Sequence, residues 1–257
     1  MELKKTKIFG LDFLNEHDLS LINAHVFRDL GKPVMNGHEL PIIFTPNVDY
    51  LVKLDRPDNK YIQDFLKKSK YILPDGQPII WASKLTRERL ITRLTGSDLF
   101  PLMFSRAQNE NIPILLLTSN EKLADFYRGF GDNVCAHALP LIKNNNIGEV
   151  AENIISMIEK SSIKIVFIGI GFPNQDLLCM EVFDRMKKKN IEYPLVCLFG
   201  AALSFFAGHE RRAPKLFQNV GMEWFYRFSK EPKRLFKRYF IDSMRFFKLL
   251  YEMRKSK

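Results

Sequence analysis

Residues 163–176 read IKIVFIGIGFPNQD, and this stretch decides the fold. The apolar run 163–169 is typical of a strand that is buried on both faces. Glycines follow it directly, and a helical pattern then covers residues 174–190. Strand, glycine turn and helix in this order make up one step of a βαβ unit, so we expect the flanking sequence to repeat it.

The repeat is present on both sides of this stretch. Expected strands cover residues 112–118, 133–139, 163–169 and 193–199, and expected helices cover 96–111, 120–130, 148–160 and 174–190. Further strands are expected at 8–14, 40–45 and 70–73. The alternation predicts a Rossmann-like, doubly wound α/β fold whose mainly parallel sheet has helices on both faces. We place this domain at residues 1–205, with a nucleotide-binding half at about 112–205.

Composition limits the class of protein. The chain has 257 residues, of which 46% are hydrophobic and 26% are charged, which favours a folded protein with an ample core. Three widely spaced cysteines and five histidines show neither a disulfide framework nor zinc-ligand spacing. The N-terminus lacks a secretory pattern, and glycine and proline interrupt the longest uncharged stretch, 193–209. These features predict a cytoplasmic protein that does not span a membrane.

The C-terminal segment carries the positive charge. From Arg211 onward the chain has fourteen basic and four acidic residues, a net of +10 that equals the charge of the whole protein. Aromatic and aliphatic residues recur there at helical spacing: Phe236, Phe240, Met244, Phe247 and Tyr251, widened by Leu235, Tyr239, Phe246, Leu249 and Leu250. We predict a basic, amphipathic helical appendage over 206–257 that closes the active site and docks on an anionic membrane surface. A core-packing helix, a subunit interface and a nucleic-acid surface are the alternatives.

Polar residues and glycines follow several expected strands, at the edge where parallel sheets bind ligands. Thr45 and Asn47 follow the strand at 40–45, and Asp75 follows the strand at 70–73 in a Pro-Asp-Gly turn. Gly169 ends the strand expected at 163–169 and Gly171 lies just beyond it. Asn174 could cap the next helix, whose N-terminus would face an anionic group. By themselves these residues also fit plain turns and tight packing.

Six blocks together resemble the WecG/TagA/CpsF family of bacterial glycosyltransferases, in the family's order and over roughly residues 8–240. They are Thr45-Pro46-Asn47; Leu73-Pro74-Asp75-Gly76; Thr95-Gly96-Ser97-Asp98; Gly169-Ile170-Gly171-Phe172-Pro173-Asn174-Gln175-Asp176; Ala207-Gly208 with Arg212-Ala213-Pro214; and Glu223-Trp224-Phe225-Tyr226-Arg227 with Glu231-Pro232-Lys233-Arg234. The resemblance implies transfer of N-acetylmannosamine or its uronate, with inversion, from a UDP-sugar donor to an undecaprenyl-diphosphate-linked acceptor. It places the protein on the inner face of the plasma membrane.

The resemblance also implies roles for individual residues. Asp75 takes the position of the catalytic base, with Thr45 and Asn47 beside it on the sugar hydroxyls. The donor would be bound by Gly169, Gly171, Pro173, Gln175, Asp176 and Arg212. The usual family pattern has lysine and glutamate where Asn174 and Asp176 stand in this chain.

Departing UDP needs positive charge, and the chain contains no DxD motif for a divalent metal. We therefore expect a metal-independent, cofactor-free enzyme in which Arg227, Arg234 and Arg238 hold the diphosphate. A homo-oligomer is possible, and nucleic acid is not an expected partner. The alternatives are a nucleic-acid or anionic-surface binding protein, and an enzyme that hydrolyses or epimerises a UDP-sugar.

Overall fold

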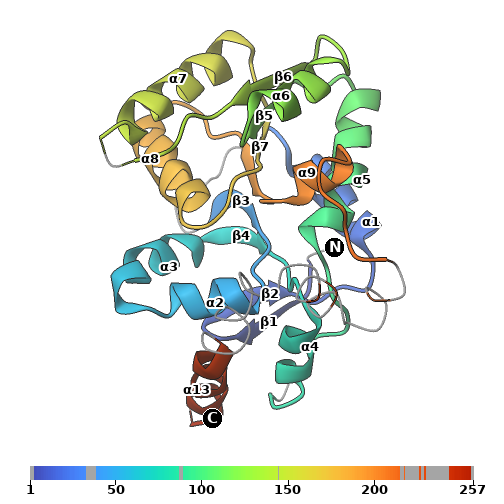
Figure 1. Cartoon of the computed structure of the whole chain (residues 1–257), viewed down its shortest axis with the longest axis vertical. Helices are drawn as coiled ribbons and strands as arrows, with labels where there is room; N and C mark the ends of the chain where they lie inside the picture. The colour runs from blue at the N-terminus through green and yellow to red at the C-terminus, as the bar shows by residue number, and fades with distance from the viewer. Residues whose placement is uncertain are drawn as a thin grey trace.

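The structure is a computed structural model that describes residues 3–32, 39–86, 89–143, 145–214, 217, 226, 229 and 243–255. Within these residues a single eight-stranded sheet has the order β1-β2-β4-β3-β8-β7-β5-β6 (Figure 1). The strands are β1 (Lys5–Ile8), β2 (Leu11–Leu14), β3 (Leu40–Phe44), β4 (Ser69–Ile72), β5 (Ile114–Thr118), β6 (Val134–Ala138), β7 (Ile165–Ile168) and β8 (Leu195–Leu198).

All neighbouring strands pair in parallel except β1 and β2, which form an antiparallel hairpin. The prediction of one strand over residues 8–14 is therefore wrong. Phe9 and Gly10 both have positive φ, 53° and 71°, and turn the chain between the two strands. Glycine adopts this conformation without steric cost, and the sequence reading treated Gly10 as part of a continuous strand.

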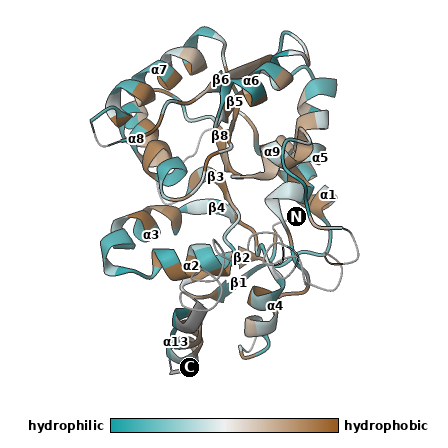
Figure 2. Ribbon diagram, viewed as in Figure 1, coloured by the Kyte–Doolittle hydropathy of each residue, from teal (hydrophilic) through white to brown (hydrophobic). Residues whose placement is uncertain are grey.

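Helices cover both faces of the sheet, as predicted. They are α1 (Leu19–Asp29), α2 (Val48–Leu54), α3 (Lys60–Leu66), α4 (Gln77–Ser83), α5 (Gly96–Asn109), α6 (Glu121–Arg128), α7 (Ile147–Lys160), α8 (Asn174–Lys188), α9 (Ala202–Phe206) and α13 (Ser243–Lys255), with a 3₁₀ turn at Pro57–Asn59. One core cluster joins the sheet to α2, α3, α7 and α8, and the other joins it to α1, α5, α6 and α9. Figure 2 shows the central strands β5 and β8 in brown, between helices that alternate teal and brown.

The C-terminal half has the strand order 8-7-5-6, so the chain reverses direction in the sheet after β6. From β5 it passes outward to β6 and then returns to the other side of β5 as β7. Doubly wound folds bind ligands at such a reversal, beyond the carboxyl ends of the strands. The predicted Rossmann-like arrangement of residues 112–205 is present.

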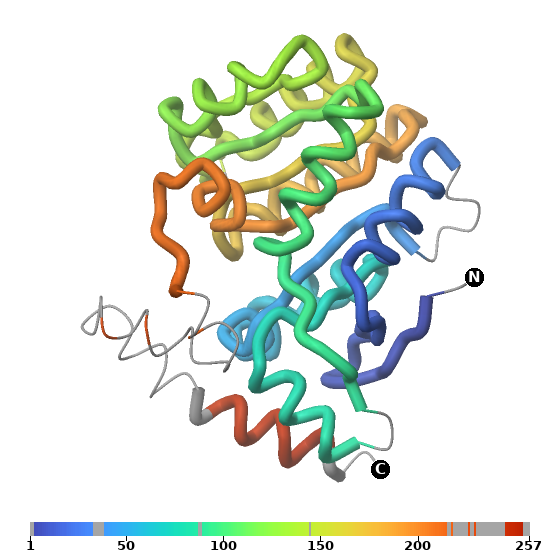
Figure 3. The backbone as a smooth tube through the Cα atoms, turned by 90° about the vertical axis from the view of Figure 1, so that its right-hand side faces the viewer, coloured from blue at the N-terminus to red at the C-terminus, as the bar shows by residue number. Residues whose placement is uncertain are grey.

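The described part of the C-terminal segment is helix α13, which packs against α2. Phe246 is buried with Val52 of α2 and Ala82 of α4, and its ring centroid lies 5.5 Å from that of Phe9. Figure 3 shows α13, in red, lying next to α4. The face of α13 that carries Phe246 therefore packs on the core, which is one of the alternatives to membrane docking. Most of the remaining predicted appendage over 206–257 lies outside the described residues.

Among the described residues, no helix is long and apolar enough to cross a membrane.

Candidate active site

Four neighbouring parallel strands, β4, β3, β8 and β7, end at the same edge of the sheet. Asp75 follows β4, Thr45 follows β3, Gly200 follows β8 and Gly169 follows β7. Segments that are far apart in the chain therefore converge above the end of β8. The structure brings the predicted catalytic residues and the predicted donor residues to this one edge.

Backbone hydrogen bonds fix the turn that carries Asp75. The Leu73 N–H donates to the Phe44 carbonyl at 2.9 Å, which extends the pairing of β4 with β3 beyond the strands. The Asp75 N–H then donates to the Pro46 carbonyl at 3.2 Å. Asp75 itself is half-buried. Its carboxylate is thus carried on a turn whose backbone is held by the neighbouring loop.

Asn47 and Thr45 lie on that neighbouring loop. Asn47 caps α2: its Oδ1 accepts from the Tyr50 N–H at 3.1 Å. Thr45 Oγ1 lies 3.5 Å from the Leu198 carbonyl at the end of β8. A Cβ added to Gly76 would lie 4.0 Å from Asn47 Cβ, so the Asp75 turn runs close beside the Asn47 loop. Because Oδ1 serves the helix, the Nδ2 group is the part of Asn47 that can donate to a ligand.

The two glycines after β7 differ in their surroundings. A Cβ on Gly169 would come within 2.7 Å of Leu203 Cδ2 and 3.2 Å of Leu203 Cβ, so this glycine lets α9 pack onto the end of β7. A Cβ on Gly171 would meet nothing within 4 Å, and the residue is exposed. Packing therefore accounts for Gly169, while Gly171 offers open backbone.

Helix α8 begins beside this turn, and two of its first residues face inward. Gln175 and Asp176 are 3% and 0% exposed. The Tyr50 hydroxyl, from α2, hydrogen-bonds to Asp176 Oδ1, and Gln175 Nε2 donates to the same hydroxyl at 3.1 Å. These contacts link the start of α8 to the helix that Asn47 caps. The expected cap by Asn174 is wrong: Pro173 holds the cap position, no side chain bonds there, and Asn174 is the first helical residue.

Burial controls the charge of this cluster. It raises the pKa of Asp176 from 3.8 to about 7, and the hydrogen bond from Tyr50 opposes the rise only in part. Burial, together with the nearby Asp176 carboxylate, raises the pKa of Tyr50 well above its usual value. The Tyr50 hydroxyl therefore keeps its proton, and Asp176 is close to its midpoint of ionisation at neutral pH.

Arg212 follows α9 in the chain, and its side chain reaches the first turn of α5. Its Nη1 is 2.6 Å from Asp98 Oδ1 and its Nη2 is 3.3 Å from Asp98 Oδ2, which is a bidentate pair. Burial raises the pKa of Asp98, but hydrogen bonds from Arg212 and Thr95 outweigh it and leave the pKa below its ordinary value. The pair anchors the segment after α9, so the structure gives Arg212 a position at the site edge with a carboxylate partner.

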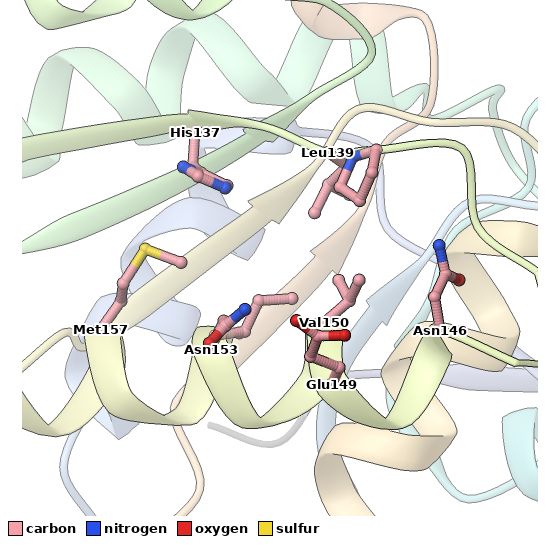
Figure 4. Close-up of a pocket in the computed structure, with 9 residues that line it drawn as sticks. His137, Leu139, Asn146, Glu149, Val150, Asn153 and Met157 are labelled. Atoms are coloured by element: carbon pink, nitrogen blue, oxygen red, sulfur yellow. The ribbon is translucent and has the colours of Figure 1, made fainter.

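The remaining predicted residues, Arg227, Arg234 and Arg238, lie outside the described residues. Within the described ranges, no group of three or more His, Cys, Asp or Glu side chains could hold a metal ion. A hollow of about 310 Å³ lies between edge strand β6 and α7, and His137, Glu149, Asn153 and Met157 are among its lining residues (Figure 4). None of the predicted site residues lines this hollow.

A doubly wound sheet with a carboxylate and several polar groups gathered at its carboxyl edge defines a class: α/β enzymes that bind their ligands beyond the strand ends. The sequence model of the glycosyl transferase WecG/TagA/CpsF family matches residues 14–257, nearly the whole chain. The chain belongs to this family, and it is a glycosyltransferase of a family that acts in cell-envelope polysaccharide synthesis.

Sequence reasoning did not single out Tyr50. It sits three residues after Asn47, in a segment that was not assigned to a helix. The run NVDYLVKL does carry a helix signal, because Asn47 is a favoured cap residue and apolar side chains recur behind it. The contact with Asp176, 126 positions away, could be seen only in the folded chain.

Proposed function

We propose that the protein is an inverting glycosyltransferase that moves N-acetylmannosamine or its uronate from a UDP donor to an undecaprenyl-diphosphate-linked sugar. The observation that carries this proposal is the loop pair at the ends of β3 and β4. There the Asp75 turn is hydrogen-bonded to the loop of Thr45 and Asn47, at the edge where four parallel strands end. Family membership supports the reaction class.

Asp75 is proposed as the general base. The acceptor hydroxyl oxygen attacks the anomeric carbon of the donor sugar, and its proton passes to the Asp75 carboxylate. A bond forms between that oxygen and the carbon, while the bond from the carbon to the UDP oxygen breaks and its electron pair leaves with UDP. Attack and departure occur on opposite faces of the carbon, so its configuration is inverted. Thr45 and Asn47 would hold sugar hydroxyls during this step.

The donor would bind across the ends of β8 and β7. The exposed backbone of Gly171 lets a ligand approach closely, and the N-terminus of α8 carries partial positive charge toward an anion. Arg227, Arg234 and Arg238 remain the proposed partners of the diphosphate. Guanidinium groups would offset the charge that develops on departing UDP without a metal ion.

The acceptor is proposed to be lipid-linked, which suits docking of the C-terminal segment on the inner membrane face. Phe247 and Tyr251 of α13 are 64% and 59% exposed, and the same helix carries the exposed cations Arg245 and Lys248. These side chains can enter an anionic interface while Phe246 holds the helix to the body. A Phe247→Ser/Lys248→Glu variant should pellet less with anionic liposomes than the wild type. Equal pelleting would remove this role.

The reaction is tested with a panel of UDP-sugars and a short-chain prenyl-diphosphate-linked N-acetylglucosamine acceptor. The expected product is a lipid-linked disaccharide with inverted anomeric configuration, formed only when donor and acceptor are both present. Release of free sugar at the same rate without acceptor would instead identify a hydrolase. An altered UDP-sugar recovered without acceptor would identify an epimerase.

A further inference from the structure

The Tyr50 hydroxyl bridges the side chains of Gln175 and Asp176. It hydrogen-bonds to Asp176 Oδ1 and lies 3.1 Å from Gln175 Nε2. A phenol has one proton to give. In the structure that proton goes to Asp176 Oδ1, and the hydroxyl oxygen accepts from the Gln175 amide nitrogen.

This proton count sets the orientation of Gln175. With Nε2 held at Tyr50, the carbonyl oxygen Oε1 must point the other way. It lies 3.9 Å from the position that a Cβ of Gly200 would take, at the end of the central strand β8. Within the described residues Oε1 is buried and has no hydrogen-bond partner, although the side chain is only 3% exposed. A buried acceptor without a donor costs free energy, so the site retains an acceptor that a ligand can satisfy.

The cover over this oxygen includes glycine backbone. Gly200 has no side chain above Oε1, and its φ of 53° is the left-handed conformation that favours glycine. The Gln175 N–H donates to the Gly171 carbonyl at 3.2 Å, and Gly171 faces open space. Gln175 therefore lies beside both turns, at the strand ends where the donor is proposed to bind.

We propose that Tyr50 is a positioning residue of the donor site, which holds Gln175 with its amide carbonyl turned toward the Gly200 turn to accept a hydrogen bond from the sugar nucleotide. Tyr50 does not touch the reacting atoms in this scheme. The hydrogen bond that Gln175 accepts comes from an N–H or O–H group of either the nucleotide or the sugar. The inference rests on the UDP-sugar donor proposed above.

The test is a double-mutant cycle on binding, with UDP and UDP-N-acetylmannosamine as separate probes in titration calorimetry. The variants are Tyr50→Phe, Gln175→Met and the double variant. Gln175→Met keeps the volume of the side chain and removes its hydrogen bonds. Tyr71→Phe is the matched control, since Tyr71 is also buried and its hydroxyl lies 3.3 Å from a carboxylate oxygen of Asp29, on the other core face.

We expect Tyr50→Phe and Gln175→Met each to weaken binding by about tenfold, the effect of one hydrogen bond. If Tyr50 acts through Gln175, the double variant should bind no more weakly than Gln175→Met alone, and Tyr71→Phe should bind as the wild type does. A loss with both probes assigns the donated hydrogen to the nucleotide, and a loss with UDP-N-acetylmannosamine alone assigns it to the sugar.

Two results overturn the inference while leaving the proposed function intact: Tyr50→Phe binding both probes as tightly as the wild type, or additive losses in the double variant. If the wild-type chain binds neither probe, the UDP-sugar donor is itself wrong, and the inference fails with it.

Discussion

The loop after β4 and the helix after β7 each bring a carboxylate to the same edge of the sheet, in opposite environments. Asp75 is half-buried on a turn whose backbone is bonded to the neighbouring loop. Asp176 is fully buried and bonded to Tyr50. A general base needs contact with its substrate, whereas a buried carboxylate can hold neighbouring side chains in place by hydrogen bonds. This contrast fits the proposal that the β3–β4 side carries the reaction chemistry and the β7–β8 side positions the donor.

Replacing the carboxylate on each side separates these roles, and Asp75→Asn has the largest expected effect. Loss of the base should lower kcat by roughly 10²- to 10⁴-fold while the fold and donor affinity stay unchanged. The measurement is turnover of lipid-linked acceptor at saturating donor. Asp12→Asn, an exposed carboxylate on β2, is the control. Wild-type turnover by Asp75→Asn would place the base elsewhere.

The buried carboxylate, Asp176, should instead affect the stability of the fold and the way in which that stability depends on pH. The pKa of Asp176 is about 7 in the folded chain against 3.8 ordinarily, so its neutral form stabilises the fold most below about pH 4. This contribution declines as pH rises and is lost above about pH 7. Between pH 5 and 7.5 the loss of this contribution should lower the free energy of unfolding by roughly 2.5 kcal/mol.

Asp176→Asn cannot ionise and should lack that decline. Denaturant unfolding of both proteins across this pH range measures the difference, in which the titration of the other groups cancels. Parallel pH curves for the two proteins would show that Asp176 titrates at its ordinary pKa.

Substitutions at the two glycines after β7 test whether the β7–β8 side of the site also has backbone that is open to a ligand. Gly169→Ala should cost about 1–3 kcal/mol of stability, because its Cβ would overlap Leu203. Gly171→Ala meets no atom and should leave stability nearly unchanged, while it weakens UDP binding. Thermal unfolding and calorimetry measure the two effects. Equal destabilisation of both variants would show that Gly171, like Gly169, is a packing glycine and not an open contact for a ligand.

The smallest expected effect concerns the cap on the β3 side. Asn47→Ala and Asn120→Ala each remove a side chain that accepts a hydrogen bond from the first turn of a helix, at 3.1 Å and 3.0 Å. Each should cost about 1 kcal/mol of stability. Only Asn47→Ala should also reduce turnover, because Asn120 caps α6, away from the Asp75 turn. An equal loss of turnover in both variants would reduce Asn47 to a helix cap.

Part of the site could be predicted from the sequence, because the carboxyl ends of parallel strands lie at one edge of the sheet. Thr45, Asp75 and Gly171 were placed there by local pattern alone, and the structure confirms that the segments converge. The expected cap at Asn174 failed because Pro173 takes that position. The roles of Gly169 and Arg212 also needed the fold, since Leu203 and Asp98 reach them from distant segments.

The sequence by itself determined the doubly wound core of residues 112–205, because strands buried on both faces read as short continuous apolar runs and their covering helices show a hydrophobic period of 3.6. It also determined the family, through blocks whose order survives in the linear chain. The tertiary structure decided the hairpin at Phe9–Gly10, the packing of Phe246 of α13 against Val52 and Ala82, and the Tyr50–Asp176 contact. Each depends on which distant segments meet, and burial then sets the free energy and the pKa of the groups at those contacts.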